Sequence, residues 1–188
     1  MSQDYSQTLN LPKTNFPMRA NLSRNEPSIL DFWDRIDLYN IMRNKSEDRF
    51  VLHDGPPFAN GKIHIGHCLN KVLKDIILKY NSIIGKGIDY IPGWDCHGLP
   101  IEHQVSRKIK NKNMPKVEIR NMCEEFALSF VESQKEEFKR LGVIADWSNP
   151  YLTIEPGFEA NQIGVFWDMY SKGFIYRGLK PVHWSPSS

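Results

Sequence analysis

The stretch from His53 to His67, HDGPPFANGKIHIGH, constrains the fold more than any other part of this chain. The short run FVLH at residues 50–53 predicts a buried strand that ends at Asp54. Two prolines and an Asn-Gly pair follow, and they cannot continue a strand, because proline lacks an N–H and Asn-Gly favours a turn. From Lys62 the sequence predicts a helix that runs to about Tyr80. A strand, a tight loop and a helix N-terminus together present free backbone N–H groups to an anion.

The predicted helix has two different faces. At about 100° per residue, one stripe is apolar and should face a core; it comprises Ile65, Leu69, Val72, Leu73, Ile76 and Tyr80. His64, His67 and Lys71 fall on the opposite side, near the end where the helix dipole is positive. Gly66 between the two histidines leaves the backbone uncovered, so this polar face suits a phosphate. The alternative interpretation is a pair of solvated histidines, which the preceding loop disfavours.

A second group of polar side chains follows a second predicted strand, at residues 88–91. Pro92 and Gly93 end this strand, so Asp95 and His97 lie just beyond its carboxyl end. The strand–helix–strand spacing predicts that the two strands are parallel neighbours. Ligands bind outside the carboxyl ends of such strands, so both side chains should lie near the first loop. The alternative for Asp95 is a helix cap, and for His97 a structural role remains equally open.

The rest of the chain predicts further helices around this strand–helix–strand unit. In order, we expect a polar arm at 1–25, a helix from Ser28 to about Arg43, helices at 101–112, 117–141 and 158–171, a loop at 145–156, and a third strand of the same sheet within 174–184. Gly142 should end the long helix, because glycine readily adopts the positive φ of a helix C-terminus. Its Phe-rich side should pack in the core, whereas Glu136 and Glu137 should be solvated.

Composition mainly excludes classes of protein. The net charge of +2 is small, and the one basic cluster, RKIKNKNMPK at 107–116, is most simply a solvated surface with some chance of contacting RNA phosphates. The three cysteines show no CxxC spacing, which predicts a reduced protein without a zinc site. No apolar run approaches the ~18–20 residues that cross a bilayer. We therefore expect a soluble, cytoplasmic protein with no membrane partner.

Four stretches together resemble one enzyme family, and they cover nearly the whole chain: DGPPFANG with HIGH at 54–67, PGWDCHGLPIE at 92–102, LGVIADW at 141–147 and KPVHW at 180–184. They resemble the class I aminoacyl-tRNA synthetases, and in detail the isoleucine-specific branch. The resemblance implies an α/β fold, namely the first half of a Rossmann-type parallel-sheet nucleotide-binding domain with helices on both faces. We expect an N-terminal arm and helix at 1–48 and this half-domain at 49–188.

The resemblance also implies a chemistry, in which isoleucine is activated with ATP and Mg²⁺ and then transferred to tRNA(Ile). His64 and His67 would act on the α-phosphate, while Gly66 and Asn60 would complete the ATP site. Pro56 and Asp95 would hold the α-ammonium group of the amino acid. Further candidate site residues are Phe58, His97 and Lys71, and no metal ligand is expected in the chain.

The chain departs from the family pattern in what it lacks. It has no KMSKS-like lysine motif, no editing insertion and no anticodon-binding helices, and the family's editing insertion would begin near Lys180–Trp184. We therefore expect an excised or split first half with weak activity alone, exposed apolar surface, and the second half as its partner. Two alternatives remain: a catalytically inert synthetase-like binding module, and a metal-dependent hydrolase that uses His53, Asp54, His64, His67, Asp95 and His97.

Overall fold

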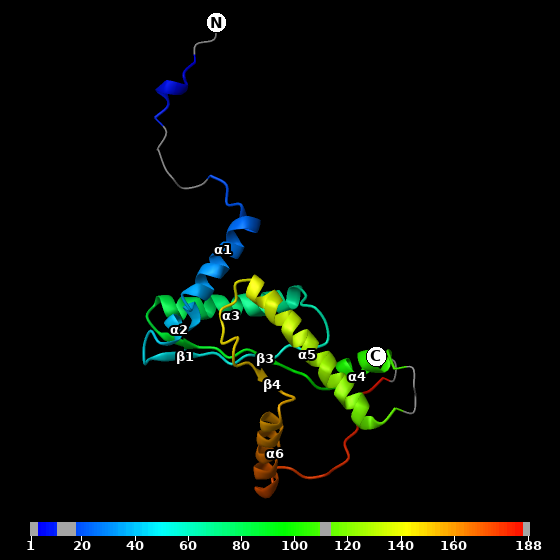
Figure 1. Ribbon diagram of the computed structural model, residues 1–188. Helices are drawn as coiled ribbons and strands as arrows, with labels where there is room; N and C mark the ends of the chain where they lie inside the picture. Colours follow the sequence, from blue (N-terminus) through cyan, green and yellow to red (C-terminus); the bar gives the residue numbers. More distant parts are fainter. Residues whose placement is uncertain (1–3, 11–17, 110–113, 186–188) are drawn as a thin grey trace.

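Strands β1 (Arg49–Val51) and β2 (Gly87–Asp89) run parallel, and helix α3 (Ile65–Ile83) connects them (Figure 1). The expected strand–helix–strand unit is therefore confirmed. The computed structural model describes residues 4–10, 18–109 and 114–185. The other elements in this part of the chain are the 3-10 helix η1 (Ser6–Thr8), α1 (Leu22–Arg35), α2 (Leu38–Arg43), β3 (Gly93–Trp94), α4 (Leu99–Ser106), α5 (Lys116–Arg140), β4 (Tyr151–Leu152) and α6 (Pro156–Ser171).

A second parallel pair, β3 with β4, continues the strand region toward the candidate site. β4 lies within the segment 145–156, which the sequence predicted to be only a loop. A single parallel bridge then joins Phe58 to Asp95. In it, the Asp95 N–H donates to the Pro57 carbonyl at 2.9 Å and the Ala59 N–H donates to the Asp95 carbonyl at 3.0 Å. The expectation that Asp95 lies beside the first loop is thus confirmed.

Strand β1 is shorter and less buried than the sequence predicted. It ends at Val51, whose side chain is 70% exposed, so the prediction of a buried strand over 50–53 is wrong. A strand in a two-stranded sheet has a neighbour on one side, and an apolar run is buried only where another layer covers it. Burial becomes complete at Asp54, which is polar.

The faces of α3 are reversed relative to the prediction. Its apolar stripe is exposed, as the side chains of Ile65 (85%) and Leu69 (62%) show. The residues that α3 buries are Lys71, Asp75, Leu78 and Ser82. These polar side chains are partnered, since Asp75 accepts the Ile144 N–H at 3.0 Å and Lys71 pairs with a buried carboxylate described below. Paired charges have removed the usual penalty for burying a polar face.

Two hydrophobic clusters lie on either side of this polar face. The first consists of Met42, Leu78, Ile88, Tyr90, Val143, Ile144 and Ala145. The second packs the loop after β1 against α4 and α5 and consists of Ala59, Trp94, Cys96, Ile101, Ala127, Val131 and Phe138. Helix α5 ends as predicted, with Gly142 at φ +79° just beyond its last turn. The second cluster fixes α5 directly beneath the candidate site.

The N-terminal helix differs from the prediction in its start. α1 begins at Leu22 rather than at Ser28 and includes Pro27, and the chain then turns at Asp37 (φ +52°) into α2, which ends at Arg43 as expected. α1 packs against α5, where Glu26 accepts from Arg140 at 3.0 Å. Of the expected polar arm, residues 1–3 and 11–17 lie outside the described part of the chain.

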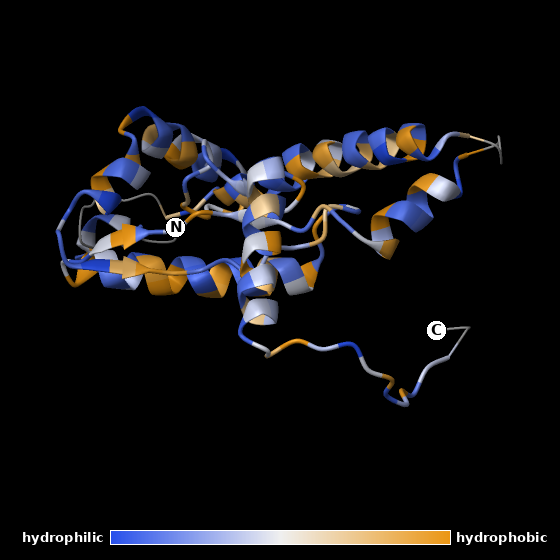
Figure 2. Cartoon of the chain, turned by 90° about the horizontal axis from the view of Figure 1, so that it is seen from below, coloured by the Kyte–Doolittle hydropathy of each residue, from blue (hydrophilic) through white to orange (hydrophobic). Residues whose placement is uncertain are grey.

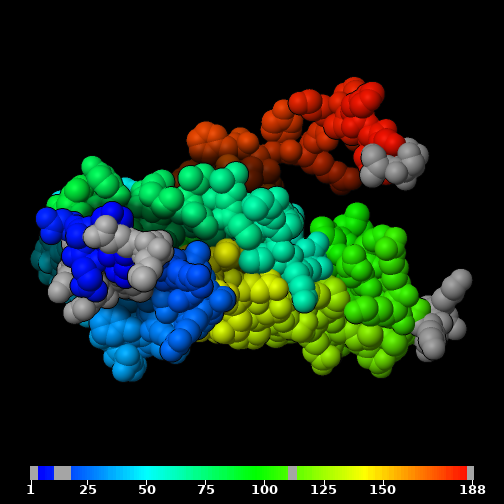
Figure 3. Space-filling model, turned by 90° about the horizontal axis from the view of Figure 1, so that it is seen from above, coloured from blue at the N-terminus to red at the C-terminus, as the bar shows by residue number. Residues whose placement is uncertain are grey.

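Helix α6 lies below the body in Figure 1, and the chain after it extends away from the rest (Figures 2 and 3). α6 buries no residue, and residues 174–185 contain no strand, so the predicted third strand is wrong. An extended apolar segment forms a strand only where another strand offers its backbone, and none of the described strands does. α6 meets the body at its first turn, where Phe158 stacks on Tyr151 with ring centroids 6.0 Å apart.

None of the described helices has the length and the apolar character that a membrane span needs.

Helix α4 ends at Ser106, before the predicted end at 112. Residues 110–113 of the basic cluster lie outside the described part of the chain.

Candidate functional site

Two imidazole rings cap the first turn of α3. His64 is the N-cap residue, and its Nδ1 accepts the Gly66 N–H at 3.1 Å. His67 reaches back, so that its Nδ1 accepts the His64 N–H at 3.3 Å. This is a capping box built from two histidines in place of the usual hydroxyl and carboxylate. The rings stack with centroids 3.8 Å apart and an interplanar angle of 19°.

The capping bonds fix the tautomer of both rings. A ring nitrogen that accepts a hydrogen bond carries no proton, so the proton of each ring is on Nε2. His64 is exposed and His67 half-buried. Burial lowers the pKa of His67, and the neighbouring His64 and Lys71 lower it further, so His67 is neutral at neutral pH. The two rings lie side by side at the positive end of a helix dipole, and His67 there is an uncharged N–H donor.

Gly66 is required by this cap. A Cβ atom at residue 66 would lie 3.0 Å from His64 Cε1 and 3.1 Å from His64 Nδ1. The capping bond also uses the Gly66 N–H, so the expectation that Gly66 leaves free backbone at the helix start needs correction. The donors that take no part in the capping bonds are the imidazole Nε2–H groups. Gly66 has no side chain, so the His64 ring can lie directly against it.

The bridge between Phe58 and Asp95 brings the two predicted halves of the site together. Asp95 is half-buried, and its Oδ1 accepts the His97 N–H at 3.3 Å. Pro56 is two residues from the bridge, and the Phe58 side chain is 47% exposed. One end of the loop that leads to the imidazole pair therefore carries Pro56 and Phe58, and Asp95 lies beside it.

His97 has partners that the sequence could not identify. Its Nε2 lies 3.0 Å from the Thr153 carbonyl oxygen and 3.3 Å from Glu159 Oε1. The first contact ties the segment after β3 to the segment after β4, and the second reaches the first turn of α6. These contacts join the segment that carries His97 to both β4 and α6.

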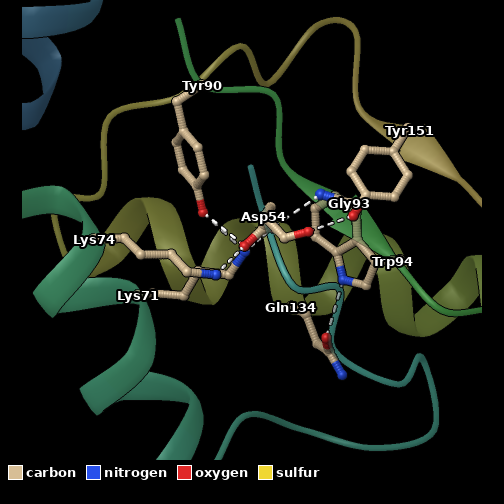
Figure 4. A network of polar contacts seen from close by, with 8 residues as sticks. All are labelled: Asp54, Lys71, Lys74, Tyr90, Gly93, Trp94, Gln134 and Tyr151. Carbon is tan, nitrogen blue, oxygen red and sulfur yellow. Dashed lines mark hydrogen bonds and ion pairs between the residues drawn. The ribbon is translucent and has the colours of Figure 1, made fainter. Parts of the chain in front are cut away.

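Asp54 is the centre of a buried polar cluster that sequence reasoning missed (Figure 4). Its Oδ1 accepts from Lys74 Nζ at 2.7 Å and from the Tyr90 hydroxyl at 2.9 Å. Its Oδ2 accepts from Lys71 Nζ and from the Gly93 N–H at 3.0 Å. Burial alone would raise the pKa of Asp54, but the two lysines and the Gly93 N–H outweigh it and lower the pKa. The carboxylate therefore fastens α3 to the strand that precedes Asp95.

Lys71 belongs to this cluster rather than to the open face of α3. Its side chain is 2% exposed and lies over the Phe138 ring, with Nζ 5.0 Å from the centroid. Burial lowers the pKa of Lys71, and the charge of Asp54 opposes this shift. Of the three side chains expected on one polar face, His64 is exposed, His67 is half-buried against Phe138, and Lys71 is buried. The sequence did contain a signal for this buried pair. Asp54 is a charged residue directly after the predicted strand at 50–53, where a buried carboxylate needs a cationic partner such as Lys71.

Helix α5 holds the loop from below. The Gln134 side chain is fully buried; its Nε2 donates to the Phe58 carbonyl at 3.0 Å and to the Gly61 carbonyl at 2.7 Å. Its Oε1 accepts from Trp94 Nε1 at 3.0 Å. The half-buried Asn60 therefore lies between two anchored carbonyls.

The prediction of a solvated Glu137 is wrong. Glu137 is half-buried, and its Oε2 accepts the Ile63 N–H at 2.9 Å, just before the capping histidines. Its neighbour Glu136 does pair on the surface, with Lys139 at 3.2 Å. Periodicity alone could not separate these two adjacent acids.

A metal-dependent hydrolase is not supported. Among the described residues, no group of three or more His, Cys, Asp and Glu side chains could hold a metal ion. Asp54 is saturated by cations and N–H donors, and His53 stacks on Tyr151 with ring centroids 5.8 Å apart. The residues proposed for a metal cluster are thus dispersed or already bonded.

The strand–loop–helix unit, with paired histidines at the helix start and an acid beyond the next strand, is typical of nucleotide-binding α/β domains. Residues 28–188 match the family described as tRNA synthetases class I (I, L, M and V). The chain belongs to this family. The α/β arrangement described above is a partial Rossmann-type fold of that class.

Individual relatives point to one branch of the family. The chain is 58% identical over 188 residues to an isoleucine--tRNA ligase of Caldicellulosiruptor bescii, and 60% identical over 187 residues to that of Syntrophomonas wolfei. These alignments cover 98% and 96% of the chain but 20% of each relative, so the chain spans about a fifth of their length.

A solved structure supports the fold. It is the ternary complex of the agnB2 LeuRS of Agrobacterium radiobacter K84 with tRNA and LeuAMS. It superposes with a TM-score of 0.68 and 23% identity, over 84% of this chain and 19% of the other.

Proposed function

We propose that this chain carries the part of an isoleucine–tRNA ligase that binds the α-phosphate of ATP and the amino group of isoleucine. The observation that carries the proposal is the pair of imidazole Nε2–H donors at the start of α3, on a loop bridged to Asp95. The identities of 58% and 60% to isoleucine--tRNA ligases support isoleucine as the amino acid and tRNA(Ile) as the acceptor.

The first reaction is an in-line displacement at phosphorus. A carboxylate oxygen of isoleucine attacks the α-phosphorus of ATP, the bond from that phosphorus to the bridging oxygen breaks, and pyrophosphate leaves. Mg²⁺ bound to the nucleotide would neutralise charge on the leaving pyrophosphate. Negative charge grows on the α-phosphoryl oxygens in the transition state. His64 and His67 donate their Nε2–H groups to these oxygens, and preorganised donors of this kind stabilise a transition state more than the ground state.

The groups that hold the amino acid are hydrogen-bond acceptors, whereas those at the phosphate are donors. The carboxylate of Asp95 and the carbonyl of Pro56 accept hydrogen bonds from the α-ammonium group. On the nucleotide side, Asn60, Phe58 and Gly66 complete the ATP site.

Lys71 and His97 act indirectly, through other residues of the site. Lys71 neutralises Asp54 behind the helix start, and His97 ties the Asp95 segment to its neighbours. We assign both to support of the site rather than to contact with the substrates.

The complete activity requires more chain than these 188 residues, because the relatives are about five times longer. The remaining length would supply the groups that hold pyrophosphate and tRNA. We therefore expect weak or negligible adenylate formation by this chain alone, and activity when it is combined with the rest of a relative.

A chimera tests the proposal. This chain replaces the matched residues of the Caldicellulosiruptor bescii isoleucine--tRNA ligase, to which it is 58% identical, and exchange of labelled pyrophosphate into ATP is measured with each amino acid in turn. We expect exchange with isoleucine and only weak exchange with valine, since one methylene is worth about 10–200-fold in an apolar pocket. A folded chimera with no isoleucine-dependent exchange would contradict the proposal.

A further inference from the structure

We propose that Gln134 of α5 is a positioning residue, which fixes the loop of the ATP site and the segment carrying Asp95 relative to each other. This inference rests on the proposed function, because it assigns Gln134 a role in aligning the two substrates. Gln134 itself contacts neither substrate in this proposal. It acts through the backbone of the loop and through Trp94.

The side-chain amide of Gln134 is fully buried and forms hydrogen bonds to both halves of the site. Nε2 has two protons, and they go to the carbonyls of Phe58 and Gly61. Oε1 accepts from the indole N–H of Trp94, which is itself fully buried. An uncharged primary amide offers two donor protons on its nitrogen and an acceptor on its oxygen. Glu, Met or Leu in the same volume cannot supply this combination.

The three bonds end on both halves of the site. Phe58 and Gly61 flank Asn60, so the two carbonyls fix the part of the loop that leads to the imidazole pair. Trp94 directly precedes Asp95 in β3. A shift of the Gln134 side chain would therefore move the ATP loop and the amino-acid carboxylate relative to each other.

The loop has few other means of holding this shape. Pro56 and Pro57 have no N–H, so this part of the loop can form few backbone hydrogen bonds. The bridge at Asp95 restrains Ala59 and Pro57, but it leaves the Phe58 and Gly61 carbonyls to be satisfied by a side chain. Removal of the amide takes the donor from two partly buried carbonyls, so the loop should change its conformation rather than only become weaker.

Helix α5 is a rigid base for this contact. One turn beyond Gln134, the fully buried Phe138 meets the edge of His67 with ring centroids 6.4 Å apart, and Lys71 Nζ lies over its ring. The same face of one helix therefore supports the loop, the capping imidazoles and the Asp54 cluster.

The first test uses this chain and does not depend on activity. Amide hydrogen exchange is measured by NMR in wild type, Gln134→Met and the control Val131→Ala, which removes volume from the same α5 core but takes away no hydrogen bond to the loop. We expect exchange at Ala59, whose N–H donates to Asp95, to accelerate at least tenfold in Gln134→Met. Exchange at Leu52, which donates to Asp89 in the β1–β2 region, should stay within threefold in both variants. Unchanged protection of Ala59 in Gln134→Met would overturn the inference.

The second test measures the consequence in the chimera. Gln134→Met should lower kcat for pyrophosphate exchange at least tenfold at a temperature where it is fully folded, whereas Val131→Ala should stay within twofold of wild type. If Gln134→Met does not fold, Gln134→Glu takes its place in both tests, because it keeps the acceptor for Trp94 and the volume. An active wild-type chimera with an unaffected kcat in the Gln134 variant would overturn the inference. An inactive wild-type chimera would instead contradict the proposed function, and the exchange of Ala59 would still decide the role of Gln134.

Discussion

The histidines at the start of α3 show how much of a residue's role depends on its immediate neighbours. From sequence, His64 and His67 are two rings on one helix face. In the structure, His64 Nδ1 accepts the Gly66 N–H and His67 Nδ1 accepts the His64 N–H, and these bonds leave both Nε2 atoms out of the cap. The position of the pair could be predicted from the HxGH spacing. The reciprocal cap could not, because it depends on ring orientation.

Gly66→Ala should weaken the cap. The new Cβ would lie 3.0 Å from the His64 ring, which is closer than side-chain contacts usually are, so the ring must shift and the bond from the Gly66 N–H to Nδ1 is weakened. Side-chain ¹⁵N NMR of this chain should show the Nε2–H tautomer for His64 in wild type and a mixture of both tautomers in the variant. Gly164→Ala in α6 is the matched control, since a Cβ there has open space, and it should leave the His64 signals unchanged. A single Nε2–H tautomer in Gly66→Ala would refute the cap.

Acid should weaken the fold through His67. The pKa of His67 is lowered from 6.5 in the folded protein, by burial first, so the unfolded chain takes up a proton at higher pH than the folded one. The stabilisation is therefore complete above about pH 6.5 and is lost as pH falls through the folded pKa. His67→Gln keeps an acceptor for the His64 N–H but does not titrate. Between pH 7.5 and 5.5, urea unfolding should show a larger loss of stability in wild type than in this variant; equal losses would exclude His67 as the cause.

At the scale of elements, the sequence predicts which elements form better than it predicts which of their faces are buried. The β1–α3–β2 unit, α5 with its Gly142 end, and the neighbourhood of the first loop and Asp95 all follow from local patterns. The apolar stripe of α3 was assigned to the core, yet its polar side is buried. Periodicity reports that two faces differ, but the pairing of Lys71 with Asp54 depends on residues far apart in the chain.

Removal of the Asp54 charge should destabilise the whole domain. Asp54→Asn leaves Lys71 buried without a counter-ion, and breaking a buried pair on one side costs about 3–5 kcal/mol. The control is Asp48→Asn, because the Asp48–Lys86 pair is at the surface (3.6 Å) and such pairs contribute less than about 1 kcal/mol. Urea unfolding of the two variants measures the difference. Equal losses would mean that the cluster does not hold α3 in place.

Over the whole molecule, apolar surface is the most prominent feature not explained by the described contacts. It comprises the outer stripe of α3, most of α6, and the irregular segment that includes Phe174, Leu179 and Trp184. Contiguous apolar surface of this extent marks an interface or drives association. The absence of a third strand belongs to the same picture, because strand pairing depends on a neighbour that a local pattern cannot specify.

The isolated chain should therefore self-associate. Sedimentation velocity at micromolar concentrations should give species heavier than the 21.9 kDa monomer. The double variant Leu69→Lys/Ile76→Lys places two charges on the exposed stripe of α3 and should shift the distribution toward monomer. Lys135→Glu, on the polar surface of α5, serves as the control for a change in charge alone. A clean wild-type monomer would contradict this expectation.

The central claim is that the paired imidazoles at the start of α3 stabilise the transition state of adenylate formation. The most direct measurement is pyrophosphate exchange by the chimera carrying His64→Ala or His67→Ala. We predict that kcat falls about 10²–10³-fold in each variant, as for loss of one preorganised donor, while the KM for ATP changes only a few-fold. Unchanged exchange rates, or a loss confined to the KM for ATP, would contradict the account.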